Sequence, residues 1–468
     1  MKRTFSTVAV ALLFSSIMFA QIRPTDQTGI NVFETAKTPT EFNGLKVDIG
    51  GSFSQPYIGL TQSNSSSALP YNATSPNTLF PLASNFSLAM ANLYLNTYLA
   101  DGVTLNFTLY LASKHHNETW VKGGFIQFDK VPFIKLDLLD NIMKFTTLKV
   151  GAMEVNYGDA HFRRSDGGNA IYNPFMENYI MDEFATEVGV EADIHLKDFT
   201  VVAAVTDGEL NGNLQQIDMV KNPASNGSHN PAFVGKLAYD KQFGEKLRVR
   251  LSGSAYYTAG SVSNTLFGGD RTGSNYSGVM YVAGPGTGTA FNGRYNPGLS
   301  DKLLTGMGNL FIKFTPIEKL SLESFTTIEK ATGRNTVETT ERNATQTATD
   351  LVVRFGEHEN FFVGARYNKV NADVAGSAAV AAVAGKPAVV DPVLGVTALA
   401  IKAVPAVAAG SAYSVGIDRL AFSAGWFVTK NILAKVEYVK QNYSGFPTAN
   451  IYDGAQFKGL TAEAVISF

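Results

Sequence analysis

The chain contains no cysteine. Disulfides, thiolate metal sites, c-type haem attachment and lipid acylation of an N-terminal cysteine are therefore excluded. Beyond its first twenty positions it also lacks any uninterrupted apolar run of about 18 residues, the length that a membrane-spanning helix needs. The formal net charge is only −2, which offers no electrostatic footprint for nucleic acid. We therefore expect no nucleic-acid partner, and no motif in the chain points to a cofactor.

The N-terminus carries the features of a secretory signal peptide. Lys2 and Arg3 form a short positive region, an apolar stretch follows over residues 8–14, and Ala20 is a small residue suited to the position before the cut. Met18 departs from the pattern, because a small residue is usual three positions before the cut. We expect residues 1–20 to be removed and the rest of the chain to be exported.

The last ten residues, 459–468, alternate between apolar and polar side chains and end on Phe468. On a strand, one face would carry Leu460, Ala462, Ala464, Ile466 and Phe468. Val465 alone breaks the alternation on the other face, where Thr461 and Glu463 lie. A closing strand of a soluble β-protein would look the same. The barrel is favoured because an exported membrane protein without a spanning helix has to cross as a closed barrel.

The remainder of the chain shows about sixteen alternating segments separated by turn residues, the pattern of an antiparallel transmembrane β-barrel. We predict strands at about 46–60, 84–100, 103–111, 123–131, 147–157, 183–195, 198–206, 231–240, 246–258, 306–316, 319–330, 348–356, 360–371, 413–428, 431–442 and 455–468. Short connections, expected on the periplasmic side, alternate with long extracellular ones. Residues 21–45 are predicted to be an extended periplasmic lead-in, and 46–468 a single barrel domain.

Charged residues on these strands share one parity and therefore one face. Arg248 and Arg250, for example, alternate with Leu247, Val249 and Leu251. An arginine facing lipid at mid-membrane costs about 2 to 4 kcal/mol, so these side chains are predicted to face the lumen. The predicted lumen-lining residues are Glu187, Glu191, Asp193, Arg248, Arg250, Asp350, Arg354, Arg366, Arg419, Lys435 and Glu437. Both signs of charge lie among them, which favours a solvated channel.

The connection at 158–182 is the third long loop in this arrangement. Because this loop is the third long loop and the chain has about sixteen predicted strands, the chain resembles bacterial porins of about sixteen strands, both general and phosphate-selective. In those porins the third loop folds into the lumen. The resemblance implies that Asp159, Arg163, Arg164 and Asp166 form a charged constriction. Alternatively, the two arginines merely pair with Asp159, Asp166 or a carboxylate of the wall. The resemblance also implies a homotrimer, and that Phe468 is an assembly signal for the barrel-insertion machinery.

These observations predict an outer-membrane porin through which small hydrophilic solutes and ions diffuse passively. Acids and bases are nearly balanced, so we expect weak ion selectivity with a slight anion preference at the constriction. The alternative is a surface barrel with an adhesive or structural role through its extracellular loops. We predict no enzyme, since no catalytic motif is present, and no metal site, since His115 and His116 read as a solvated loop pair. The Ala/Val-rich loop 374–410 has no assigned role.

Overall fold

The computed structural model describes residues 23–37, 42–65, 70–72, 75–76, 79, 82–112, 119–165, 169–209, 217–225, 227–261, 264, 266–268, 278–280, 293–376, 389–390, 397–398, 410–448 and 450–468. The predicted signal peptide, Asp166 and the pair His115 and His116 lie outside these residues. Most of the 374–410 loop also lies outside them.

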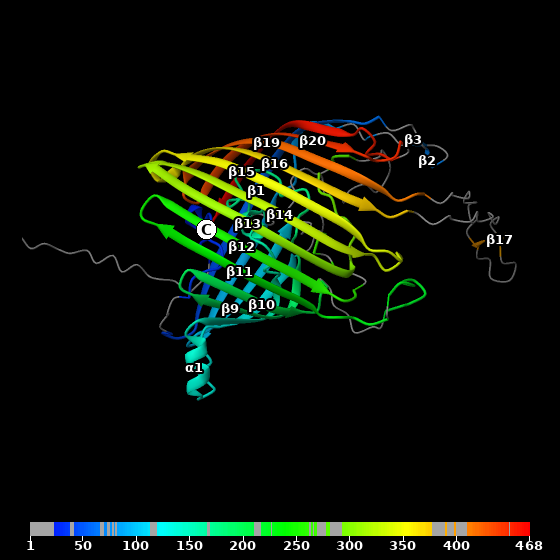
Figure 1. Ribbon diagram of the computed structural model, residues 1–468. Helices are drawn as coiled ribbons and strands as arrows, with labels where there is room; N and C mark the ends of the chain where they lie inside the picture. Colours follow the sequence, from blue (N-terminus) through cyan, green and yellow to red (C-terminus); the bar gives the residue numbers. More distant parts are fainter. Residues whose placement is uncertain are drawn as a thin grey trace, which may run out of the picture.

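Sixteen long strands of the described chain form one antiparallel sheet that closes on itself (Figure 1). They are β1 (Lys46–Ser63), β5 (Met90–Ala100), β6 (Val103–Ala112), β7 (Thr119–Phe128), β8 (Thr146–Glu154), β9 (Thr186–Leu196), β10 (Phe199–Thr206), β11 (Ala232–Phe243), β12 (Leu247–Thr258), β13 (Asp301–Ile317), β14 (Leu320–Arg334), β15 (Arg342–Phe355), β16 (Phe361–Val374), β19 (Tyr413–Thr429), β20 (Ile432–Ser444) and β21 (Gln456–Ser467). Each overlaps one predicted strand, so the predicted fold is confirmed.

The remaining elements are short. They are η1 (Gln27–Gly29), β2 (Pro70–Asn72), β3 (Ser75–Pro76), β4 (Asn85–Phe86), α1 (Asp137–Met143), η2 (Ala160–Arg163), η3 (Glu357–Glu359), β17 (Val389–Val390) and β18 (Thr397–Ala398). The helix α1 lies between β7 and β8, in the connection between the predicted strands at about 123–131 and 147–157. It projects from one end of the barrel, whereas β2, β3 and β17 lie at the opposite end (Figure 1).

The barrel closes where its first and last strands meet. β1 pairs with β5 on one side and with β21 on the other, in register from Ser52 with Ser467 to Ser63 with Gln456. The backbone N–H of Phe468 donates to the carbonyl of Gly51 at 2.9 Å, and the N–H of Gly51 donates to the carbonyl of Phe468 at 2.9 Å. The C-terminal residue therefore extends the seam, and no edge is left open along it.

The two faces of the wall differ as the alternation predicts. On β12, Leu251 is 57% exposed on the outside while its neighbour Arg250 is 2% exposed on the inside. Leu237 on β11 and Leu351 on β15 are likewise 55% and 56% exposed. Large apolar side chains exposed on neighbouring strands suit contact with hydrocarbon, because water would disfavour such a surface. The polar face is left for the interior.

Candidate functional site

The described residues of the third loop, 155–165 and 169–185 between β8 and β9, fold into the barrel. Phe175, Met176 and Ile180 are each at most 1% exposed. The loop backbone is held by side chains of the opposite wall: the N–H of Met176 donates to Glu437 Oε2 at 2.6 Å, and the N–H of Ile180 donates to Asn368 Oδ1 at 2.6 Å. The inner wall therefore satisfies backbone groups that a buried loop would otherwise leave unpaired.

The loop enters the interior through a close backbone approach at Gly158. This residue has φ +69°, in the left-handed region that favours glycine. A Cβ at this position would overlap the sulfur of Met307 on β13. Gly158 therefore lets the chain leave β8 and turn against the wall.

Asp159, the first predicted constriction residue, is only 1% exposed and is anchored to the wall. Its carboxylate accepts two hydrogen bonds from Arg250 at 2.8 Å and lies 2.7 Å from Lys236 Nζ. Ser252 Oγ donates to it at 2.6 Å. Burial by itself raises the pKa of Asp159, but Lys236 and Arg250 outweigh it and hold that pKa well below its ordinary value. The residue fastens the loop and stays ionised.

The two predicted constriction arginines are also buried. Arg163, 3% exposed, lies with its guanidinium carbon 4.9 Å from the Phe325 ring centroid and 3.9 Å from a Glu323 oxygen at its nearest nitrogen. Arg164, 5% exposed, donates two hydrogen bonds of 2.8 Å to Asp182 of the same loop. Burial raises the pKa of Asp182, but Arg164 outweighs it and lowers that pKa. Arg163 thus lies beside a wall carboxylate, as in the alternative that the sequence left open, whereas Arg164 pairs with Asp182, a partner that the alternative did not include.

The predicted lumen-lining side chains on β15 to β20 are covered by the third loop. Arg366 donates to both Asp350 oxygens at 2.7 and 2.8 Å and to the carbonyl of Glu177. Lys435, 2% exposed, donates to the carbonyls of Ala170, Asn173 and Phe175 at 2.9 to 3.0 Å. These bases act as anchors for loop carbonyls.

The other predicted lining residues also lie on the inner face. Arg354 donates to Glu323 at 2.9 Å, and Arg419 donates to Gln441 at 2.7 Å. Glu187 accepts from Tyr256 at 2.9 Å. Glu191 and Asp193 each lie 2.7 Å from Lys149 Nζ. The interior charges are therefore organised in complementary sets, and the expected open lining of free charges is not what this part of the wall presents.

Val465, the residue that breaks the alternation of the last strand, has a role in this packing. It faces inward, is fully buried, and belongs to an apolar cluster with Ile171 and Tyr172 of the third loop. Phe362 of β16 and Leu433 of β20 belong to the same apolar cluster. An inward apolar residue on a barrel strand is thus a docking point for the loop.

Residues 23–37, here called the inner strap, also lie inside the barrel. The N–H of Gln27 donates to the carbonyl of Lys430 in the β19–β20 turn at 2.8 Å. At the other end, Lys37 Nζ donates to the carbonyl of Asp129 at 2.7 Å and to those of Met143 and Thr146. The strap therefore crosses the interior near the end with the short turns, which differs from the extended periplasmic lead-in expected for 21–45.

The middle of the strap is held by charge and by rings. Glu34 lies 2.7 Å from Lys236 Nζ and 2.6 Å from an Arg250 nitrogen, so these two bases bridge it to Asp159. Phe33 packs against Arg250, whose guanidinium carbon lies 4.3 Å from the centroid of the Phe33 ring. Burial raises the pKa of Glu34, but Lys236 and Arg250 outweigh it and lower that pKa to about 2. No local sequence pattern reports these contacts, because their partners are far apart along the chain.

One sector of the inner wall differs from the rest. The inward residues of β5 and β6 carry no charge, and they pair across the strands as Tyr94 with Thr108, Asn96 with Asn106 and Tyr98 with Thr104. We call these six residues the neutral wall. Five of the six are partly exposed, Thr104 being the buried one. Sequence reasoning followed charged positions and missed this sector.

Ionic side chains flank the neutral wall and keep access to water. On β1, which pairs with β5, Lys46 lies 2.8 Å from Asp48, and their side chains are 52% and 29% exposed. On β8, beyond β7, the side chain of Lys149 is 21% exposed and that of Glu154 is 36% exposed. Glu154 lies 2.6 Å from His161 of the third loop. By contrast, Arg419, Asp350 and Glu437 on the opposite side are at most 1% exposed. The inner face therefore keeps more access to water around the neutral wall than at Arg419, Asp350 and Glu437, where the third loop docks.

A buried carboxyl group lies at the end of the third loop. Glu183 accepts a hydrogen bond from Gln346 Nε2 at 2.8 Å and lies beside Glu329 of β14. Burial, and next the neighbouring carboxylate of Glu329, raise the pKa of Glu183 well above its ordinary value. The carboxyl group of Glu183 therefore holds its proton to higher pH than those of Asp159 and Asp182 in the same loop.

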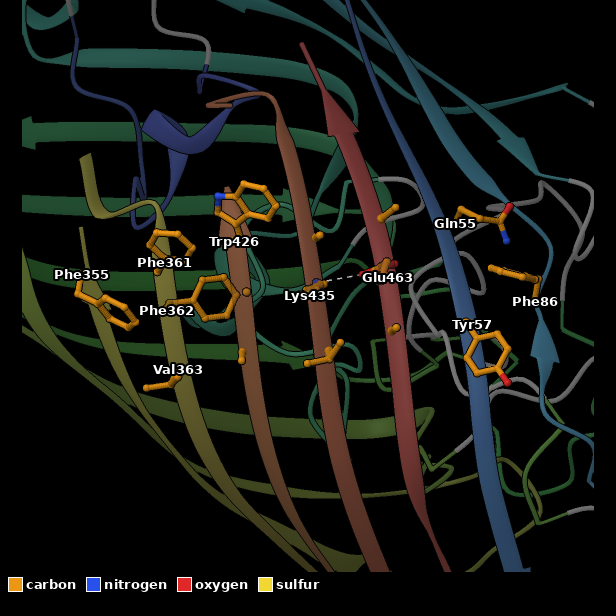
Figure 2. A pocket seen from close by; sticks show the side chains of 16 residues that line it. Gln55, Tyr57, Phe86, Phe355, Phe361, Phe362, Val363, Trp426, Lys435 and Glu463 are labelled. Atoms are coloured by element: carbon orange, nitrogen blue, oxygen red, sulfur yellow. Dashed lines mark ion pairs between the residues drawn. The ribbon is translucent and has the colours of Figure 1, made fainter. Parts of the chain in front are cut away.

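The outer wall carries a groove of about 610 Å³ across β15 to β21 and β1 (Figure 2). Phe355, Phe361 and Trp426 stack along one side, with successive ring centroids 5.7 and 6.1 Å apart. Tyr57 and Phe86 pack edge to face on the other side at 5.2 Å. Small residues form the floor, among them Ala424, Ala434, Ala462 and Ala464. Aromatic side chains at this position match the girdles that flank the apolar band of membrane barrels.

In the part of the chain that the structure describes, no helix is both long and apolar enough to cross a membrane. Groups of three or more metal-ligating side chains are absent from the same residues.

The fold and its two faces define a closed β-barrel whose outer wall is apolar and whose interior is polar and occupied by a loop and a strap. No protein-family model matches the chain, and no curated protein does. Among solved structures, OmpT of Vibrio cholerae in its trimer form is 11% identical, with a TM-score of 0.45, and the match covers 91% of this chain and 100% of that one.

Two further solved structures are similar to the same degree. The outer membrane channel DcaP of Acinetobacter baumannii is 10% identical at a TM-score of 0.45, over 91% of this chain and 98% of that one. An anion-selective porin from Comamonas acidovorans is 9% identical at 0.44, over 91% and 100%. Similarity this low carries no conclusion about function, so the architecture rests on the strand pairing of the chain itself.

Proposed function

We propose that this chain is a porin of the bacterial outer membrane through which small hydrophilic solutes diffuse passively. The observation that carries the proposal is the closed sixteen-strand barrel with exposed apolar residues outside and polar residues inside. A barrel of about sixteen strands is too wide to be filled by wall side chains alone, so its interior needs further chain or water. The third loop and the inner strap narrow the interior, and solutes pass beside them.

The charge preference that we propose is weak. Asp159, Arg163 and Arg164 are paired, as are the wall carboxylates and bases around them, so the interior field is close to balanced. We assign these residues, together with Asp166, to the region that sets the narrowest passage. Lys149 and Glu154 on β8, and the paired Lys46 and Asp48 on β1, contribute ionic groups with access to water.

The remaining assignments belong to the same proposal. Residues 1–20 direct export, and Phe468, 61% exposed on the outer face, is the assembly signal read by the barrel-insertion machinery. Lipid covers the outer wall, and identical copies associate as a homotrimer. No enzymatic activity is proposed, because the interior polar groups hold a loop in place. The buried position of the third loop disfavours a purely adhesive barrel, whose function would reside in extracellular loops.

Purified protein in a planar bilayer tests this function. We expect stepwise increases in conductance, and a reversal potential near zero in a salt gradient of potassium chloride. A correctly folded barrel, verified by its heat-modifiable migration in gels, that produces no steps would overturn the channel and favour the adhesive alternative. A large reversal potential would leave the channel in place but contradict the balanced interior.

A further inference from the structure

The interior of the barrel divides into two halves of different chemistry. On β12 to β20 many of the inward side chains are ionic and paired, and several of them lie under the third loop, with Arg366 3% and Lys435 2% exposed. On β5 and β6 the inward side chains are uncharged along the full length of both strands. A solute that crosses the interior therefore has the neutral wall beside it for as long as the loop stays docked.

The position of this wall follows from the strand register. Asn96 of β5 pairs with Asn106 of β6, and Asn106 pairs in turn with Phe125 of β7. One step along, Tyr94 pairs with Thr108. Residues paired in register share a face, so amides, hydroxyls and aromatic rings form adjacent rows on the inside.

The polar groups of the wall are suited to a partner that both donates and accepts hydrogen bonds. An asparagine amide offers two donors and an acceptor, and a threonine or tyrosine hydroxyl offers both functions. Among the described residues, Asn106 Nδ2 is a buried donor without a hydrogen-bond partner in the protein. The Asn106 side chain as a whole is partly exposed, so a rotation of its amide would present this donor to a hydrogen-bonding group in the interior.

An ion gains little from such a wall. Leaving water costs an ion much more than it costs a neutral polar molecule unless an opposite charge receives it. The ionic residues that flank the wall already have partners: Lys46 pairs with Asp48 on β1, and on β8 Lys149 and Glu154 pair with Glu191 and His161. A molecule with many hydroxyl groups, by contrast, can exchange its hydrogen bonds to water for bonds to amides and hydroxyls, and its C–H faces can pack on tyrosine rings.

We propose that the preferred solutes are neutral polyhydroxylated molecules of the saccharide class, and that they cross along the neutral wall with Asn96 and Asn106 as the central hydrogen-bonding pair. This inference rests on the proposed channel function and names its substrate class. In this proposal the neutral wall determines which solutes are preferred, and the paired charges hold the third loop and the strap in place.

Liposome swelling with three matched solutes tests the proposal. Glucose, gluconate and glucosamine share a six-carbon skeleton and are neutral, anionic and cationic at neutral pH. With full-length protein, we expect glucose to enter faster than either ion by about two- to tenfold, the effect of one net hydrogen bond. If gluconate or glucosamine enters as fast as glucose, the proposal is overturned, whereas absence of all swelling and conductance would overturn the channel itself.

A pair of variants locates the effect. Asn106→Asp places a charge on the neutral wall and should lower the glucose rate about two- to tenfold while shifting the reversal potential toward cation preference. Asn343→Asp, on the exposed end of β15, makes the same chemical change away from the wall and should leave both unchanged. Asn106→Leu removes the hydrogen-bonding group without adding a charge, should lower the glucose rate in the same range, and serves if the charged variant does not fold. Equal glucose rates in wild type, Asn106→Asp and Asn106→Leu would contradict the assignment.

Discussion

At the scale of single residues, the alternation of strands predicted which way side chains point, and it did so because that property is local. Arg250 faces inward simply because its neighbours Val249 and Leu251 are apolar. What Arg250 contacts was beyond the sequence, because Asp159 and Glu34 reach it from segments far away along the chain. For the same reason, the rank of the loop predicted a set of constriction residues, but the burial of Asp159, Arg163 and Arg164 could not be predicted.

Glu183 provides a prediction at this scale. Its pKa is raised in the folded protein, so the folded state holds a proton that the unfolded state loses above about pH 4.5. The free energy of unfolding should therefore fall as pH rises from that value toward the folded pKa. Glu183→Gln stays neutral and should remove this decline, raising Tm at alkaline pH by about 2 to 4 °C for each kcal/mol relieved.

Thermal unfolding in detergent from about pH 4 to about pH 9 measures this difference. Glu318→Gln, an exposed carboxylate in the β13–β14 turn, is the matched control and should leave the pH profile unchanged. Parallel profiles for wild type and Glu183→Gln would show that the carboxyl group is not held protonated.

At the scale of elements, the sixteen strands were predictable and the strap was not. A strand can be predicted because its apolar and polar residues alternate with a period of two and turn residues bound it. The strap has no period. Its position is determined by Asn31 donating to Glu323 at 2.7 Å, by Phe33 among rings, and by Glu34 between two bases. Each contact joins segments more than a hundred residues apart, so only the folded barrel defines them.

Removing the strap should widen the passage. Deletion of residues 21–37 takes away Phe33 and Glu34 and frees Lys236 and Arg250 of one partner each. We expect a larger single-channel conductance and a shift toward anion preference, because two buried bases gain access to water. Single-channel recording in a planar bilayer measures both.

Glu34→Gln serves as the companion variant, since it keeps the strap but removes its charge. It should shift selectivity in the same direction with a smaller change in conductance. Deletion variants with the conductance of the wild type would indicate that the strap lies outside the conducting path.

At the scale of the whole molecule, the groove on the outer wall across β15 to β21 and β1 is a candidate contact surface between copies. Its floor of alanines lies between two aromatic groups, next to the seam where β21 meets β1 (Figure 2). Under the proposed trimer, a neighbouring copy seats on this groove. Ala462→Trp should fill it and convert the trimer to monomer, as measured by chemical cross-linking and by light scattering of the purified protein.

Ala255→Trp, on the exposed outer face of β12, adds the same side chain on a different sector and should leave association unchanged. If Ala462→Trp associates like the wild type, the copies meet elsewhere or do not meet.

The cluster of Glu34, Asp159, Lys236 and Arg250 has a consequence for biogenesis. It contains two acids and two bases contributed by the strap, the third loop and two barrel strands, and all four are buried together. If one partner is missing, a buried charge is left without an opposite charge, which typically lowers the free energy of unfolding by about 3 to 5 kcal/mol. A barrel that closes with its loop or strap misplaced is therefore much less stable than one that closes correctly. The cluster therefore couples closure of the wall to correct placement of the third loop and the strap, because only the correctly assembled interior pairs all four charges.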